Sequence, residues 1–272
     1  VNENATLTVP AASGVLANDT DVDAGDTKTV SAVAFGVTSG TVGSALNGTY
    51  GTLTLNVDGS YSYVANRPAA EALITGQSAV DTFSYTVRDA AGATASTTLS
   101  FTIDGANDAP TITGPLSGAV TEDLAPGTTG GTLVITDADA GQSSFVAQPG
   151  TAGTYGTFAI TAAGVWSYTL NNAAANVQAL PGGAAPTETF TITTADGTTR
   201  TITVTVNGAN DAPVANANTV AATEDTALTI APATLLGNDT DIDSGTTLTI
   251  TSVQGAVNGS VALVGGNVVF TP

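Results

Sequence analysis

A six-residue stretch occurs twice in this chain, and it constrains the fold more than any other sequence feature. Gly105-Ala106-Asn107-Asp108-Ala109-Pro110 returns letter for letter at residues 208–213. Such an identity at a distance indicates a tandem array in which each repeat is one structural unit. Proline fixes its own φ and biases the preceding residue toward extended geometry. Gly, Asn, Asp and Pro are also ordinary turn residues, but acidic residues return beside both copies, so we predict a stiff linker between modules.

The segments between these linkers have the pattern of antiparallel β-structure. Residues 52–57 and 60–64 alternate apolar and polar side chains around Asp58-Gly59, a strong hairpin turn. Residues 83–87 and 99–103 form a second pair of the same kind. About seven strands in roughly 100 residues predict an all-β immunoglobulin-like or cadherin-like sandwich.

The repeats predict a linear array of these sandwiches. The expected modules are residues 1–109, 110–212 and a partial third, 213–272, which lacks the last strands of the pattern. Ala-rich stretches at 69–74 and 173–180 are expected to form a turn or two of helix. Alternation predicts an aromatic core that includes Tyr61, Tyr63, Phe83, Tyr85 and Phe101 in the first module, and Trp166, Tyr168 and Phe190 in the second.

The charge balance limits the partners. The chain has 23 Asp and Glu residues, 4 Lys and Arg residues, no His, and a formal net charge of −19. Nucleic acid and anionic membrane surfaces both need a basic protein surface, so both are poor partners. No run of about 18 apolar residues is present, which argues against direct membrane insertion. An acidic surface attracts cations, and clustered carboxylates suit calcium.

Enzyme chemistry is not expected. Without Cys or His, the chain has neither a thiol nucleophile nor an imidazole base. Paired carboxylates could in principle hydrolyse glycosides, but here they recur on the loops of every repeat, as scaffold ligands do. The absence of Cys also excludes disulfides as the staple of the modules.

The acidic residues are predicted to gather at the seams, meaning each linker with the loops that adjoin it. In such a sandwich the loop between the second and third strands lies at the end where the chain enters, near the preceding linker. For the first seam the candidate ligands are Asn107, Asp108, Glu122, Asp123, Asp137 and Asp139, with Asp81 from the module before it. For the second seam they are Asn210, Asp211, Glu224, Asp225, Asp239, Asp241 and Asp243, with Glu188 from the module before it. The equivalent loop of the first module offers Asp19, Asp21 and Asp23.

Hard oxygen ligands without sulfur or imidazole favour calcium over zinc or copper, and place it ahead of magnesium. The alternative is that these carboxylates are simply solvated surface groups. Against it, like charges packed this closely repel one another without a counter-ion.

Several of these motifs resemble VCBS repeats. They are Asn18-Asp19-Thr20-Asp21-Val22-Asp23, Tyr50-Gly51-Thr52-Leu53, Asp58-Gly59-Ser60-Tyr61-Ser62-Tyr63 and the Asn-Asp-Ala-Pro linkers. The third repeat is more similar to the related bacterial cadherin-like modules. The resemblance implies a very long, secreted bacterial surface protein, often an RTX-type adhesin, in which such arrays separate a cell-anchored end from a ligand-binding tip. The second repeat lacks the first Asn-Asp of the acidic loop, which puts a full set of ions there in doubt.

Three functions follow as hypotheses. The first is an extracellular extender whose partners are the neighbouring repeats of the same chain and whose stiffness depends on calcium at the seams. The second is a module that binds a glycan or protein ligand. The third is a fibre subunit whose incomplete modules are filled by strands from neighbouring chains.

Overall fold

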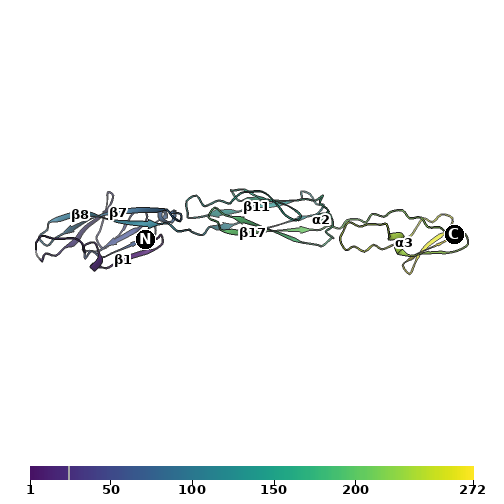
Figure 1. Cartoon of the computed structure of the whole chain (residues 1–272), viewed down its shortest axis with the longest axis horizontal. Helices are drawn as coiled ribbons and strands as arrows, with labels where there is room; N and C mark the ends of the chain where they lie inside the picture. The colour runs from purple at the N-terminus through teal and green to yellow at the C-terminus, as the bar shows by residue number, and fades with distance from the viewer. Residues whose placement is uncertain (24) are drawn as a thin grey trace. The chain divides into compact units, whose positions relative to one another are not determined.

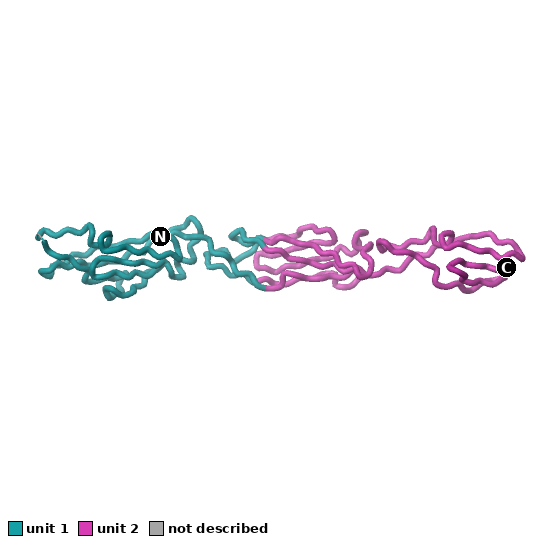
Figure 2. The backbone as a smooth tube through the Cα atoms, turned by 90° about the horizontal axis from the view of Figure 1, so that it is seen from below, with its two compact units in different colours: residues 1–113, 134–146, 193–199 teal, residues 114–133, 147–192, 200–272 magenta. Residues whose placement is uncertain are grey.

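The structure, a computed structural model, describes residues 1–23 and 25–272. The chain divides into two compact units, coloured separately in Figure 2. Unit one comprises Val1–Thr113, Val134–Val146 and Thr193–Thr199, and unit two comprises Gly114–Leu133, Ala147–Ile192 and Arg200–Pro272. The division therefore falls inside the predicted second module, and some of that module's loops belong to unit one.

Unit one contains a sandwich of two four-stranded sheets (Figure 1). One sheet has the order β1-β6-β5-β4, formed by Thr6–Val9, Tyr61–Val64, Thr52–Leu55 and Ala45–Asn47. The other has the order β3-β2-β7-β8, formed by Thr38–Gly40, Thr29–Phe35, Ser78–Arg88 and Thr94–Asp104. The predicted hairpin at Asp58-Gly59 joins β5 to β6 in antiparallel register, with Leu53 opposite Tyr63.

Aromatic side chains fill the space between these two sheets. Tyr63 and Phe83 are fully buried, and Phe101 is 5% exposed. The rings of Tyr63 and Phe101 stack with centroids 4.0 Å apart, and Phe83 meets both edge-on. Strand alternation thus places the core where the sequence predicts it.

The second sandwich has a related but shorter set of strands. One sheet has the order β10-β17-β16, from Ser117–Thr121, Thr199–Asn207 and Thr187–Thr193. The facing sheet has the order β11-β15-β14-β13, from Thr128–Thr132, Val165–Leu170, Gly156–Ile160 and Gln148–Ala152. A two-stranded sheet pairs β9 (Thr111–Thr113) with β12 (Val134–Thr136).

Trp166 is a core residue, as its alternating position predicts. It is 1% exposed, and its indole N–H donates to the carbonyl oxygen of Pro115 at 3.0 Å. Because the single polar atom of the ring is satisfied, the side chain can be buried at no hydrogen-bonding cost.

A parallel pairing in each sandwich determines where its first acidic residue lies. β10 runs parallel to β17, with Thr121 opposite Asn207, and an isolated parallel bridge joins Asn2 to Asp104. The entering strand therefore ends beside the end of the last strand, where the next linker begins.

The remaining elements are short. α1 (Pro68–Glu71) begins one residue before the predicted stretch 69–74, α2 (Ala175–Gln178) lies within the predicted stretch 173–180, and α3 (Pro232–Leu236) is a further helix of one turn. Residues 214–272 form one three-stranded sheet, β18-β20-β19, from Leu228–Ile230, Asn267–Thr271 and Ser260–Val264. No helix among the described residues is long and apolar enough to cross a membrane.

Candidate metal centre

Each copy of the repeated linker begins with a glycine that the packing requires. A Cβ on Gly105 would lie 2.2 Å from the carbonyl oxygen of Leu73, and one on Gly208 would lie 2.5 Å from that of Leu180. The N–H of Gly105 also donates to the carbonyl oxygen of Gln77 at 2.9 Å. The linker therefore leaves the sandwich pressed against the segment after the short helix, and only glycine fits there.

The residues after Gly105 are held by carboxylates. The N–H of Ala106 donates to Glu3 Oε1 at 2.8 Å, and the N–H of Asp108 donates to Asp139 Oδ2 at 2.9 Å. The N–H of Asp139 in turn donates to Asp137 Oδ1 at 3.0 Å, an Asx-type turn that fixes the acidic loop. Backbone donors thus orient one oxygen of Glu3, Asp137 and Asp139.

The other oxygen of each carboxylate has no hydrogen-bond partner within residues 1–23 and 25–272. These buried oxygens are Glu3 Oε2, Asp137 Oδ2, Asp139 Oδ1 and Asp108 Oδ2. Glu3, Asp108 and Asp139 each bring a carboxylate oxygen to within 4.8 Å of the other two, and Glu3 and Asp139 are 6% and 1% exposed. Buried oxygens without partners are costly unless a cation or water meets them. We call this group, with Glu71, the first acidic cluster.

The electrostatics of this cluster favour a cation. Burial raises the pKa of Glu3, the N–H of Ala106 lowers it, and the charges of Asp108 and Asp139 raise it again. Burial also raises the pKa of Asp108, and the charges of Glu71, Asp139 and Asp137 add to the rise. The neighbouring carboxylates therefore disfavour the ionised forms of Glu3 and Asp108, and a divalent cation would remove that penalty.

The second acidic cluster repeats this arrangement within unit two. The N–H of Ala209 donates to Glu122 Oε2 at 3.2 Å, and the N–H of Asp211 donates to Asp243 Oδ2 at 2.9 Å. Asp243 N–H donates to Asp241 Oδ1 at 2.9 Å, as Asp139 does to Asp137. The buried oxygens that lack partners in the described residues are Glu122 Oε1, Asp211 Oδ2 and Asp243 Oδ1. Burial, with the charges of Asp123, Asp211 and Asp243, raises the pKa of Glu122, while the Ala209 N–H lowers it.

Glu122 and Asp123 lie at the second linker, and the prediction that placed them at the first is wrong. Both share a cluster with Asp211. The physical reason is the parallel pairing of β10 with β17: the strand carries the chain to the far end of its own sandwich, where the N–H of Glu122 donates to the carbonyl oxygen of Asn207 at 2.9 Å. Sequence proximity to Pro110 was a poor guide to position.

The same displacement of the entering strand's acidic residues to the far end of their own module accounts for the positions of Glu3, Glu224 and Asp225. Glu3 occupies the first cluster and was not predicted as a ligand, although Glu3, Glu122 and Glu224 stand at matching places in the repeats. Glu224 and Asp225 are exposed and share no acidic cluster with Asp211 in the described part of the chain. The repeat correspondence, rather than distance from the linker, was the signal that could have found Glu3.

Asp81 and Glu188 are hydrogen-bonded inside their own sandwiches, contrary to the expected seam position. Asp81 is fully buried and accepts from the N–H groups of Thr49, Tyr50 and Gly51 at 2.9 to 3.0 Å. The Tyr63 hydroxyl donates to the same carboxylate at 2.7 Å. In the second sandwich Glu188 accepts from the N–H groups of Thr154 and Tyr155 and from the Tyr168 hydroxyl. These two carboxylates hold a loop to the core.

Both clusters contain a hydrogen-bonded pair of one carboxylate and one amide side chain, but the two side-chain types stand at opposite positions in the two pairs. In the first, Asn4 Nδ2 donates to Glu71 Oε2 at 3.0 Å. In the second, Gln178 Nε2 donates to Asp123 Oδ1 at 3.1 Å. Asn4 and Asp123 both have a φ near +60°, a conformation that Asn and Asp tolerate. Each cluster therefore keeps one carboxylate from this pair, and Glu71 is a candidate ligand that the sequence analysis missed.

The remaining predicted residues lie around these clusters. Asn107 Nδ2 donates to the carbonyl oxygen of Asp108, and Asn210 Nδ2 to that of Asp211. Asp21 and Asp23 group with Asp26 in the loop of the first module, and Lys28 donates to the carbonyl oxygen of Asp19. Asp239 is not a member of the second cluster's hydrogen-bond chain, because its Oδ1 accepts from the N–H of Asn216 at 2.7 Å.

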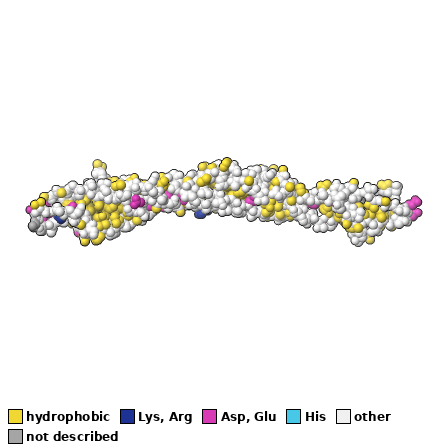
Figure 3. Space-filling model, viewed as in Figure 1, with side chains coloured by type: hydrophobic (Ala, Val, Ile, Leu, Met, Phe, Trp, Pro, Cys, Tyr) yellow, Lys and Arg dark blue, Asp and Glu magenta, His cyan; other side chains and the backbone are white. Residues whose placement is uncertain are grey.

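The surface outside the clusters is mostly uncharged on the face shown in Figure 3. Acidic groups are scattered there, and basic groups are rare, in line with 4 Lys and Arg residues in the chain.

Comparison with known proteins gives one family assignment. Residues 1–105 and residues 107–208 each match the family described as bacterial cadherin-like domain. Residues 209–272 match a second family, described as cadherin-like domain. No curated protein matched the chain.

Solved structures similar to the chain are cadherin extracellular regions. The protocadherin GammaB4 extracellular domain is 15% identical with a TM-score of 0.46, and the match covers 88% of this chain and 37% of the protocadherin chain. Human CDH23 EC21-23 is 14% identical with a TM-score of 0.40, covering 92% of this chain and 85% of its own. Mouse clustered PcdhgC3 EC1-3 is 18% identical with a TM-score of 0.38, covering 85% of this chain and 76% of its own. With TM-scores below 0.5, the fold assignment rests on the strands described above and on the family matches.

Proposed function

The chain belongs to the bacterial cadherin-like family, and from that premise we propose that it is an extender segment of a long secreted bacterial surface adhesin, stiffened by calcium at its linkers. Domains of this family are typically not catalytic. The VCBS-like motifs and the acidic composition support placement in a calcium-dependent, RTX-type surface protein outside the cell.

The observation that carries the proposal is that the two oxygens of several cluster carboxylates have different roles. In Glu3, Asp139, Glu122 and Asp243 one oxygen accepts a backbone N–H, which fixes the side chain, and the other is buried without a partner in the described residues. Calcium takes about 6–8 oxygen ligands and tolerates mixed carboxylates, carbonyls and water. In the first cluster Glu3, Glu71, Asp108, Asp137 and Asp139 would hold it. In the second cluster Glu122, Asp123, Asp211, Asp241 and Asp243 would do so.

Stiffening follows from which segments supply these ligands. Asp108 is in the linker, Glu3 precedes the first strand, and Asp137 and Asp139 are in a loop far away in sequence. Without metal the charges repel one another, which favours separation of these segments. An ion that binds all of them would neutralise that repulsion and restrain the linker.

The proposed modules are residues 1–109, 110–212 and 213–272, with the two linkers as their boundaries. The proposed partners are neighbouring repeats of the same chain, which agrees with the tandem family matches. Extracellular calcium modules typically bind at about 10⁻⁴–10⁻³ M, an affinity suited to the outside of a cell.

Isothermal titration calorimetry of the metal-free chain with calcium tests the proposal. We expect saturable binding with a dissociation constant below about 1 mM. Magnesium should bind more weakly, because it demands near-ideal octahedral geometry and dehydrates reluctantly. Equal binding of both ions, or no saturation by calcium at 10 times that concentration, would refute a built calcium site.

A further inference from the structure

The second sandwich leaves one strand edge open that the first sandwich covers. In the first, β2 pairs along β7 from Thr29 opposite Arg88 to Phe35 opposite Phe83. In the second, the corresponding strand β16 has on this side only a short partner among residues 1–23 and 25–272: Phe145 bridges Thr194, and Val146 N–H donates to the carbonyl oxygen of Thr193 at 2.8 Å.

A shorter connection between the two sheets of the second sandwich causes this difference. After Phe145 and Val146 the chain crosses to the other sheet, where Thr151 lies opposite Phe158. In the first sandwich the matching positions are Val30, opposite Val87, and Leu46, opposite Leu53. The interval from Val30 to Leu46 is thus ten residues longer than that from Phe145 to Thr151, and those ten residues supply the covering strand.

Backbone hydrogen bonds show which groups of β16 face the open edge. The carbonyl oxygen of Pro186 accepts from Val206 N–H, toward β17. The carbonyl oxygen of Thr191 instead accepts from the Gln148 side chain at 2.9 Å, as that of Thr193 accepts from Val146. Backbone groups alternate between the two sides of a strand in an antiparallel sheet. The N–H and C=O groups of Thr187, Thr189 and Thr191 therefore point to the open side.

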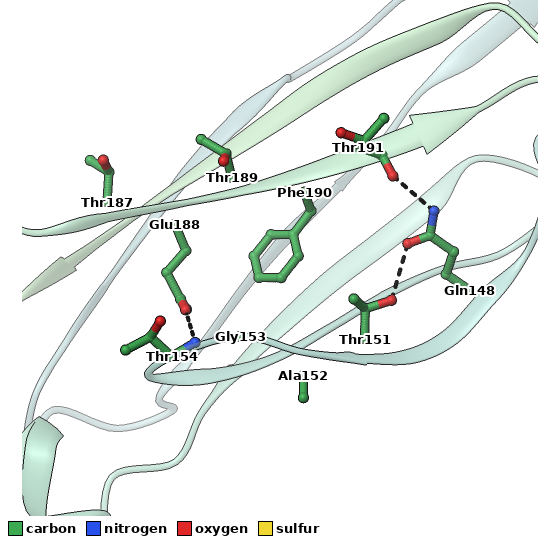
Figure 4. A pocket seen from close by; sticks show the side chains of 10 residues that line it. All are labelled: Gln148, Thr151, Ala152, Gly153, Thr154, Thr187, Glu188, Thr189, Phe190 and Thr191. Atoms are coloured by element: carbon green, nitrogen blue, oxygen red, sulfur yellow. Dashed lines mark hydrogen bonds between the residues drawn. The ribbon is translucent and has the colours of Figure 1, made fainter.

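A groove of about 610 Å³ runs along this edge (Figure 4). β16 forms one wall and residues 151–154, after the start of β13, form the other, while Phe190 lies between them. Among the described residues that line it, the only charged side chain is Glu188, whose oxygens already accept from Tyr155 N–H and the Tyr168 hydroxyl. The segment 187–193 contains no Lys, Arg or Pro, the residues that commonly protect exposed edges.

We propose that this groove binds an extended, uncharged or basic peptide strand of a partner protein, which adds to β16 as a further antiparallel strand. The first sandwich shows the chemistry that fits. There the edge takes Val33-Ala34-Phe35, and the Phe35 ring lies 4.9 Å from that of Phe83, the counterpart of Phe190. The occupant would thus place a large apolar side chain by Phe190 and small ones beside it. A net charge of −19 disfavours an acidic partner, including a second copy of this chain.

The test uses the whole chain and a synthetic peptide with the sequence of residues 28–38, labelled for fluorescence anisotropy. The expected result is saturable binding of the peptide, with an affinity that falls at least tenfold in a Phe35→Ser version. Thr189→Pro removes one edge N–H at a position where proline is tolerated, and it should weaken binding at least tenfold, whereas Thr189→Ala should not. Hydrogen exchange gives an independent measurement: the amides of Thr189 and Thr191 should exchange rapidly alone and slowly with peptide.

Three outcomes would overturn the proposal. They are no binding at millimolar peptide, equal binding by the wild type and a folded Thr189→Pro variant, and slow exchange of those two amides without peptide. Dimers that Thr189→Pro abolishes would identify a second copy of the chain as the occupant instead.

Discussion

The backbone N–H of Asp108 donates to Asp139 Oδ2 at 2.9 Å, and the same contact recurs between Asp211 and Asp243 at 2.9 Å. In both pairs the other carboxylate oxygen of the acceptor is buried without a partner in the described residues. A backbone hydrogen bond thus joins each linker residue to the acidic loop that follows it. This tie makes the two clusters comparable, and it allows one to be altered while the other serves as the control.

Asp139→Ala should weaken calcium binding at the first cluster and leave the second intact, because the two ligand sets do not overlap. In calorimetry we expect the calcium affinity of one class of sites to fall at least tenfold. Asp243→Ala should give the mirror result. Asp104→Asn makes a similar change of charge on a side chain outside the cluster and should change little. Equal losses at both sites from a single substitution would contradict independent clusters.

The exchanged pair gives a second prediction. Glu71→Gln removes one carboxylate from the first cluster and should weaken its calcium binding. Adding Asn4→Asp rebuilds there the Asp–Gln pair of the second cluster, in which Gln178 donates to Asp123. The double variant should therefore recover most of the lost affinity. Failure of Asn4→Asp to restore binding, in a variant with wild-type thermal stability, would show that the two positions are not equivalent.

Asp81→Asn should destabilise the first sandwich without changing the calcium affinity of the clusters. Asp81 accepts from three backbone N–H groups and the Tyr63 hydroxyl. In the variant, the amide NH₂ group would replace one acceptor oxygen and face these donors without a hydrogen bond. Loss of these buried bonds should cost on the order of 3 kcal/mol in the free energy of unfolding. Urea unfolding followed by circular dichroism measures it, with Asp58→Asn in an exposed turn as the control. A loss of calcium binding by a folded Asp81→Asn chain would restore its expected role as a ligand.

The linker glycine gives a fourth prediction. Gly105→Ala places a Cβ 2.2 Å from the Leu73 carbonyl oxygen, so the linker must move away from the sandwich. We expect a loss of thermal stability and weaker calcium binding at the first cluster. Gly150→Ala, where the nearest atom to a Cβ is 3.7 Å away, should be tolerated. Scanning calorimetry compares the two, and equal melting temperatures would contradict a packed linker.

The sequence predicts local structure well here because the local signals agree with one another. Alternation and the Asp58-Gly59 turn predict a hairpin, and the structure confirms it. Trp166, Tyr168 and Leu170 alternate with Ser167 and Thr169, and all three are buried. These features depend on residues close together in the chain.

Long-range placement was harder to predict, for identifiable physical reasons. The parallel pairing of β10 with β17 carries Glu122 away from the linker that it follows in sequence. Asp81 has the charge of a ligand, but its hydrogen bonds come from a loop some 30 residues earlier, 49 to 51. The missing partner strand of β16 appears only when the two sandwiches are compared in register.

Small-angle X-ray scattering of the whole chain, in millimolar calcium and in chelator, tests the central claim most directly. Calcium bound to both clusters should restrain the linkers, so the maximum dimension should rise and the flexibility seen in the Kratky plot should fall. A variant with Asp139→Ala and Asp243→Ala should resemble the chelated wild type in both solutions. Identical scattering of the wild type with calcium and with chelator, together with an unchanged melting temperature, would contradict a calcium-stiffened extender.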